Sequence, residues 1–73
     1  MEQYIITYKT ENNIYIYDNF TGVYDNYEEA DAAFEFIKND LTENIAECGR
    51  FSIIIECEKN GNTNVVKIYD SEK

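Results

Sequence analysis

Hydrophobic and polar residues alternate with a period of two in the last third of the chain. The stretch from Phe51 to Glu58 reads FSIIIECE, a pattern typical of a strand with one buried face. The Asn60-Gly61 pair that follows is the pair most typical of a two-residue type I′ turn. We therefore predict a β-hairpin in which Lys59 lies opposite Asn62.

A regular register counted back from this turn places Ile55 opposite Val66 and Ile53 opposite Ile68. The predicted inward-facing residues are Phe51, Ile53, Ile55, Cys57, Val66 and Ile68. The predicted outward-facing residues are Ile54, Glu56, Glu58, Val65, Lys67 and Tyr69. Both strands then direct their apolar residues to the same side, as a sheet with one covered face requires.

Apolar residues recur at intervals of three and four in the middle of the chain, which predicts a helix with one apolar stripe. The stripe comprises Tyr27, Ala30, Phe34, Ile37, Leu41 and Ile45. The helix is expected from about Tyr27 to about Glu47, with Gly49 as its C-terminal stop. Asn39-Asp40 is its weakest point, and Thr42 could cap a second short helix.

Two capping boxes are open at the start of this helix. Asn26 can cap with Glu29 three residues later, and Asp25 with Glu28 is the alternative. Acidic residues also favour the first turn because they face the positive end of the helix dipole.

The first quarter of the chain predicts a second hairpin. Gln3 to Lys9 and Ile14 to Tyr17 are rich in β-branched and aromatic residues, and a polar cluster at 10–13 separates them. Residues 18–26 are expected to connect this hairpin to the helix. The predicted fold is therefore a single α+β domain over residues 1–73. Its order is ββαββ, with two β-hairpins forming a four-stranded antiparallel-rich sheet and one helix packed on one face.

The charge of the chain restricts its partners. Fifteen acidic residues against six basic residues give a net charge of −9 over 73 residues, which repels nucleic acids and anionic membranes and attracts basic surfaces. The alternative is that the acidity serves only to keep the protein soluble. The sequence does not distinguish between a basic partner and solubility. We find no signal peptide and no apolar stretch long enough to span a membrane. The cysteines form neither a CxxC motif nor a disulfide framework. We therefore expect a cytoplasmic protein, located in the host cytoplasm if it is phage-encoded.

Residues that would support catalysis are scarce. The chain has no histidine, the usual general base and a common zinc ligand, and has only two cysteines, Cys48 and Cys57. The three glycines do not form a phosphate-binding pattern. We therefore expect no enzymatic activity, no cofactor and no bound metal.

Acidic residues and tyrosines outside the expected core are the candidate partner-binding residues. Tyrosine is frequent at interface hot spots, and carboxylates can stand in for phosphates on an Arg/Lys-rich surface. The candidate residues are Glu28, Asp31, Glu35, Glu56, Glu58, Tyr15, Tyr17, Tyr24 and Tyr69. For any one of them, an ordinary role as solvated helix side or strand former is the alternative.

In size and charge the chain resembles phage and mobile-element proteins that block host defence nucleases, including anti-CRISPR proteins; no sequence motif carries this resemblance. It implies a small protein-binding inhibitor that mimics nucleic acid and occludes the basic nucleic-acid-binding surface of a target such as a nuclease. The alternative is a small structural or regulatory interaction domain that self-associates as a homodimer through the open sheet face, with acidity serving only solubility.

Overall fold

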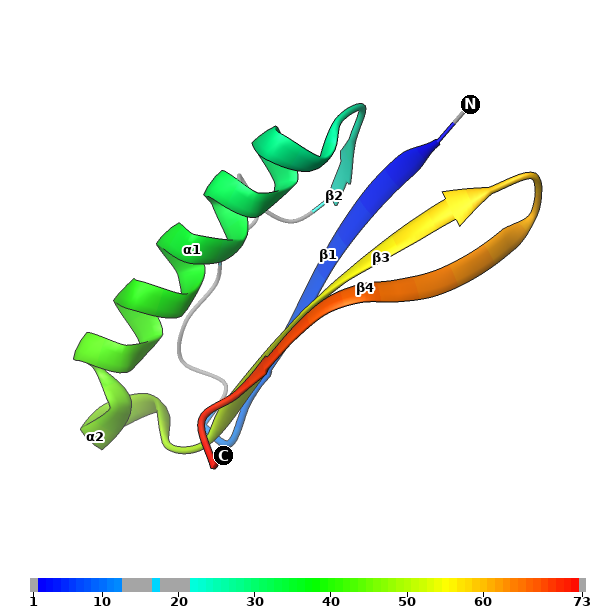
Figure 1. Ribbon diagram of the computed structural model, residues 1–73. Coiled ribbons are helices and arrows are strands. Elements are labelled where there is room, and N and C mark those ends of the chain that lie inside the picture. Colours follow the sequence, from blue (N-terminus) through cyan, green and yellow to red (C-terminus); the bar gives the residue numbers. More distant parts are fainter. Residues whose placement is uncertain (1, 13–16, 18–21, 73) are drawn as a thin grey trace.

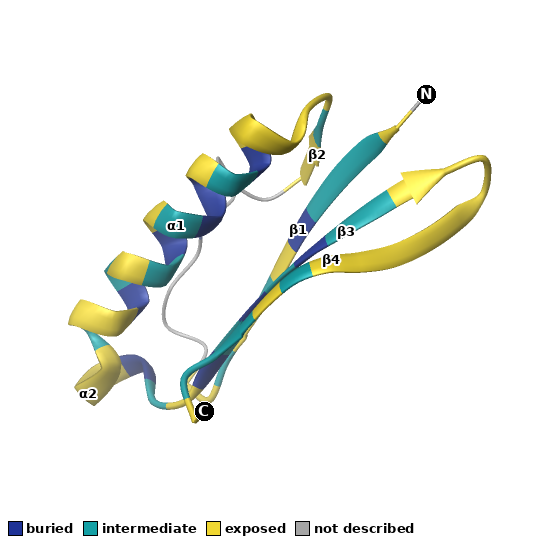
Figure 2. Ribbon diagram, in the orientation of Figure 1, coloured by how far each residue is buried: buried dark blue, intermediate teal, exposed yellow. Residues whose placement is uncertain are grey.

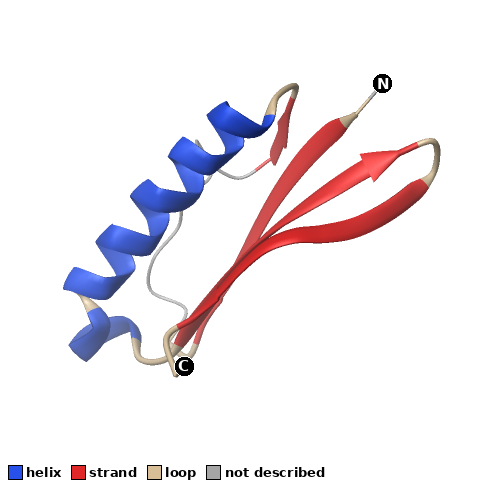
Figure 3. Cartoon of the chain, viewed as in Figure 1, coloured by secondary structure: helices blue, strands red, loops and turns tan. Residues whose placement is uncertain are grey.

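The computed structural model describes residues 2–12, 17 and 22–72. Its elements follow the order β1 (Gln3–Thr10), β2 (Gly22–Tyr24), α1 (Tyr27–Glu43), α2 (Ile45–Cys48), β3 (Phe51–Lys59) and β4 (Asn62–Asp70). The four strands form one antiparallel sheet in the order β2-β1-β3-β4. Helix α1 covers one face of this sheet (Figures 1 and 3). The predicted α+β fold is thereby confirmed.

The second strand of the sheet lies later in the chain than we predicted. Residues 22–24, expected to be part of a connection, form β2 and pair with β1. Of the strand predicted from Ile14 to Tyr17, residues 14–16 lie outside the described residues. Tyr17 is described, and it is buried without belonging to a strand.

Helix α1 begins as the sequence indicates. Asn26 is the N-cap, and its side-chain oxygen accepts a hydrogen bond of 2.8 Å from the backbone N–H of Glu29. The first capping register is therefore the correct one. The helical region breaks at Asn44 rather than at Asn39-Asp40, and α2 ends at Gly49, whose φ of 76° is a conformation that glycine adopts without strain.

The core lies between α1 and the covered face of the sheet (Figure 2). It contains Ile6, Tyr17, Ala30, Ala33, Phe34, Ile37, Leu41, Cys48, Phe51, Ile53 and Ile55. The helix stripe is confirmed from Ala30 to Leu41, whereas Tyr27 and Ile45 at its two ends are exposed. The stripe therefore extends only as far as the sheet beneath it.

The second hairpin has the predicted turn but a different register. Asn60 and Gly61 have positive φ, and Lys59 pairs with Asn62. Pairing then shifts by one residue: Glu56 pairs with Val65, Ile55 with Lys67, and Val66 between them has no opposite residue. Our prediction assumed regular pairing from the turn onward and therefore did not include this β-bulge.

This bulge reverses the predicted faces of β4. Lys67 and Tyr69, predicted to point outward, lie on the helix side opposite Ile55 and Ile53. Ile68 and Val66, predicted to be inward, are 66% and 46% exposed. Cys57 is only partly buried. The prediction that the two strands share one apolar side is therefore wrong beyond the bulge.

Candidate protein-binding surface

Helix α1 carries the largest concentration of charge in the described chain. Its 17 residues include six acidic residues and one basic residue, Lys38, so the helix alone has a net charge of −6 + 1 = −5. From Glu28 to Glu43 the helix rises about 22 Å. The acidic side chains therefore form an extended array rather than a single cluster.

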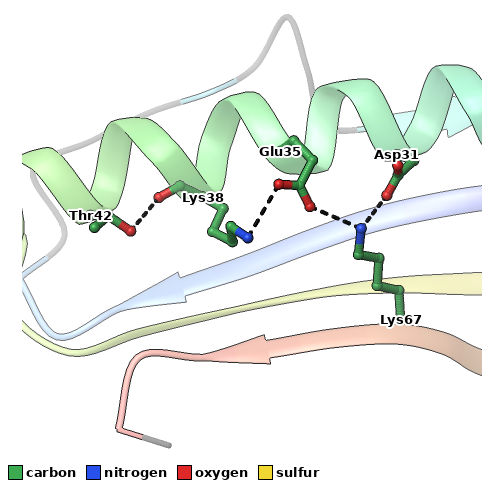
Figure 4. A network of polar contacts seen from close by, with 5 residues as sticks. All are labelled: Asp31, Glu35, Lys38, Thr42 and Lys67. Carbon is green, nitrogen blue, oxygen red and sulfur yellow. Dashed lines mark hydrogen bonds and ion pairs between the residues drawn. The ribbon is translucent and has the colours of Figure 1, made fainter.

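Two of these acids are neutralised by a lysine from the sheet. Lys67 Nζ donates hydrogen bonds to Asp31 Oδ1 and, at 2.9 Å, to Glu35 Oε2 (Figure 4). Lys38 Nζ lies 3.2 Å from the other oxygen of Glu35. Lys67 Nζ also lies 4.6 Å from the centre of the Phe34 ring. Asp31 and Glu35, both predicted partner-binding residues, thus help to hold α1 to β4.

The pKa values of this network reflect the same contacts. Hydrogen bonding to Asp31, reinforced by Glu35, raises the pKa of Lys67 to about 12. The hydrogen bonds from Lys67 and then Lys38 lower the pKa of Glu35 below its usual value. Both shifts favour the charged forms of Lys67 and Glu35.

A second ion-pair group lies at the end of the sheet near the C-terminus. Arg50 lies 3.6 Å from a Glu11 carboxylate oxygen and 3.5 Å from a Glu72 carboxylate oxygen. Lys38, Arg50 and Lys67 are three of the six basic residues of the chain. Internal contacts therefore already use half of its positive charge.

The remaining predicted acids do not share one surface. Glu28 is exposed on α1, whereas Glu56 and Glu58 lie on the sheet face away from the helix, on the opposite side of the molecule. In the described part of the chain, no ion pair involves Glu28, Glu29, Glu43, Glu56 or Glu58. The exposed side of α1 therefore presents Glu28, Glu29 and Glu43 without a neutralising cation.

The predicted tyrosines are taken up by the core more than expected. Tyr17 is 7% exposed, and its hydroxyl donates a 2.5 Å hydrogen bond to Asp40. Burial, and then the Asp40 carboxylate, raise the pKa of Tyr17. Tyr24 and Tyr69 are partly buried against the core, with Tyr69 beside Phe51, and Tyr15 lies outside the described residues. The expectation that the core leaves these rings outside is wrong for Tyr17.

An aromatic residue that we did not predict lies on the acidic side of the helix. Phe36 is 49% exposed, at helical positions between those of Glu29 and Glu43. Its position outside the three-and-four spacing of the buried stripe was the signal that could have identified it. An exposed aromatic ring among carboxylates combines apolar contact with charge, which suits a protein partner.

The other face of the sheet is open and partly apolar. It includes Val23, Val65 and Ile68, which are 57%, 54% and 66% exposed, together with the half-buried Ile5 and Ile54. A hollow of about 240 Å³ on this face is lined by Thr7, Lys9, Ser52 and Ile54 among others. The bulge determined this composition, because it placed Ile68 rather than Tyr69 here.

Groups suited to chemistry are few in the described residues. A hollow of about 360 Å³ lies beside Glu11, Arg50 and Glu72, whose charged groups pair with one another. Burial raises the pKa of the Cys48 thiol, which disfavours the reactive thiolate. Among the residues that the structure describes, no three His, Cys, Asp or Glu side chains are grouped to hold a metal ion. Nor is any described helix long and apolar enough to span a lipid bilayer.

Comparison of the chain with protein-family models, curated proteins and solved structures finds no match.

Proposed function

We propose that this protein acts by binding rather than by catalysis, and that it occludes a basic, nucleic-acid-binding surface of another protein. The target would be a nucleic-acid-handling protein such as a nuclease, as for inhibitors of the anti-CRISPR type. The proposal rests on one observation. The exposed side of α1 presents carboxylates that no described cation neutralises, in a chain with a net charge of −9.

The charge spacing on α1 supports this proposal. Glu28, Glu29 and Glu43 are three exposed carboxylates along about 22 Å of helix, and none of them forms an ion pair in the described chain. One strand of B-DNA carries about six phosphates over that length, at one per roughly 3.4 Å. The helix therefore offers about half of the charge that a phosphate-binding groove would meet on one strand.

The carboxylates and the Phe36 ring of α1 indicate which groups the partner surface should contain. A groove lined by Arg and Lys would pair with the carboxylates, and an apolar pocket or an Arg side chain would contact the half-exposed ring of Phe36. Glu56 and Glu58 lie on the opposite face, so they would not contact a partner bound to α1. The proposed partner-binding site is therefore α1 alone.

Charge reversal on the two faces tests the proposal. Glu28→Lys with Glu43→Lys changes the net charge from −9 to −5, and Glu56→Lys with Glu58→Lys gives the same −5. A basic, nucleic-acid-binding protein captured from cells on the immobilised chain is incubated with its nucleic acid and with the unmodified chain or one of the two variants. Displacement of the nucleic acid is followed by gel shift. We expect the α1 pair to lose at least about tenfold in affinity and the sheet pair to retain most of it.

Two results would contradict the proposal. Equal losses in both double variants would mean that net charge alone drives binding and that α1 is not the site. Unchanged binding in both would mean that electrostatics plays no part. Circular dichroism on each variant verifies that the fold is retained.

A further inference from the structure

Strand β4 is the long free edge of the sheet. In the described part of the chain, no strand pairs with its outer side, and it extends over nine residues. The opposite edge, β2, has only three residues. An edge strand directs alternate backbone N–H and C=O groups away from the sheet, where another strand can pair with them.

Two contacts identify which backbone groups of β4 point outward. The two-residue turn makes Lys59 and Asn62 a hydrogen-bonded pair, so the next outward residue is Thr63. At the other end, the Ser71 N–H donates to the Phe51 carbonyl at 2.9 Å. The backbone of Ser71 therefore points toward β3, and the direction alternates along the strand. Between the bulge and this end, the backbone groups of Ile68 point outward.

The protections that usually block an edge are weak on β4. The chain contains no proline, and the only lysine within the strand, Lys67, is turned beneath α1 and neutralised by Asp31 and Glu35. The bulge at Val66 divides the strand but leaves both halves exposed at their edges. Val65, Val66 and Ile68 are 54%, 46% and 66% exposed.

The charge along β4 selects the partner. The charged residues of β4 are Lys67, which Asp31 and Glu35 already neutralise, and Asp70 at the end of the strand. One lysine and one aspartate give β4 no net charge, so its edge is close to neutral in a chain of −9. This edge does not attract a basic partner in particular, whereas two copies of the chain can pair antiparallel here with their two Asp70 residues at opposite ends of the paired strands.

We propose that two copies of this chain pair antiparallel along β4 to form one continuous eight-stranded sheet. A two-fold axis that pairs one edge with itself must be perpendicular to the sheet, so both copies of α1 lie on the same side. Helix α1 packs mainly on β1 and β3. At a strand spacing of about 4.8 Å, the two helices would be roughly 20 Å apart. That distance is about twice the Debye length at 0.1 M salt, so their repulsion is largely screened.

This dimer goes beyond the proposed inhibitor function and uses a different surface. It would present two acidic helices to one partner, which raises binding through avidity when both engage. The salt dependence of the two interactions is opposite. Salt weakens binding of α1 to a basic partner, but it strengthens pairing of two negatively charged copies. Failure of one proposal is therefore distinguishable from failure of the other.

The first test uses the unmodified protein. Sedimentation equilibrium from micromolar to millimolar concentration should show a rise toward twice the monomer mass of 8.6 kDa, at lower concentration when salt is raised. Over the same range, exchange of the Thr63 and Ile68 amide hydrogens should slow by about tenfold or more, because pairing protects them. A monomer at every concentration overturns the proposal.

The second test separates edge pairing from packing of the open sheet faces. Ile68→Pro and Thr63→Pro each remove an outward N–H and should abolish the dimer, whereas Thr63→Ala retains the N–H and should leave it intact. Ile54→Asp places a charge on the open face from the central strand β3. It should leave an edge dimer unchanged.

The opposite pattern overturns the proposal. If Ile54→Asp abolishes the dimer while the Thr63 and Ile68 amides exchange equally fast at all concentrations, the copies meet through the open face. If Ile68→Pro fails to fold, Thr63→Pro near the turn and the amide exchange of the unmodified protein decide the question.

Discussion

Lys67 is the residue whose role changed most between sequence and structure. The regular register placed its ammonium group in solvent, whereas it lies on the helix side between Asp31, Glu35 and the ring of Phe34. Its partners are 32 or more residues away in the chain. No local pattern relates residues at that separation.

The first prediction concerns the stability that this lysine provides. Lys67→Met keeps an apolar stem over Phe34 but removes the charge, and we expect a loss of about 1 kcal/mol at pH 7 after allowing for partial exposure. Lys59→Met is the matched control, because Lys59 lies at the exposed hairpin turn and forms no ion pair in the described chain. Urea unfolding measures both.

The pH dependence of this loss has a defined sign. The folded pKa of Glu35 is below its unfolded value of 4.5, so its contribution is present above about pH 4.5 and is lost as the pH falls further. The pKa of Lys67 is raised from 10.5 to about 12, so its contribution is present below pH 10.5 and is lost as the pH rises through 12. The difference between the protein and Lys67→Met should therefore be constant in between and shrink on both sides. A difference that stays unchanged at pH 3 would contradict the ion-pair explanation.

At the scale of elements, the bulge in β4 decides which residues face the helix. Val66 is the extra residue, and the pairs on both sides of it already have consistent faces: Glu56 with Val65 outward, and Ile55 with Lys67 inward. Removing Val66 would leave a regular ladder with these faces retained.

Two single-residue deletions test this reading. Deletion of Val66 should change the free energy of unfolding by about 1 kcal/mol or less. Deletion of Ile68 should move Tyr69 to the open face, remove its contact with Phe51 and cost about 2–3 kcal/mol. Thermal unfolding compares the two, and equal losses would argue against the bulge assignment.

At the scale of the whole molecule, the dominant property is negative charge on a small body. A net charge of −9 destabilises the compact state by self-repulsion, which salt screens. The midpoint of urea unfolding should therefore rise between about 20 mM and about 500 mM NaCl, with an unchanged slope. Choline chloride at the same ionic strength should act equally, because screening does not depend on the cation. A rise with sodium alone would instead indicate a specific cation site.

The sequence by itself determined the properties that depend on neighbours in the chain. The capping residue Asn26, the buried stripe from Ala30 to Leu41, the inward residues Phe51, Ile53 and Ile55, and the type I′ turn follow from local spacing and backbone preference. The first strand, the central helix and the two strands of the last hairpin follow from the same periodicities, whereas β2 lies in a segment that these periodicities left as a connection. Net charge, with its consequences for steering and repulsion, is also a property of composition alone.

Only the tertiary structure decided which side each distant residue takes. The single unpaired residue Val66 reversed half of β4, because side chains alternate with a period of two and one extra residue exchanges the faces. The position of β2, the burial of Tyr17 and the neutralisation of Asp31 and Glu35 depend on contacts between separate elements. The candidate site was therefore predictable in its charge but not in its location: it lies on the outer side of α1, with the sheet acids on the opposite face.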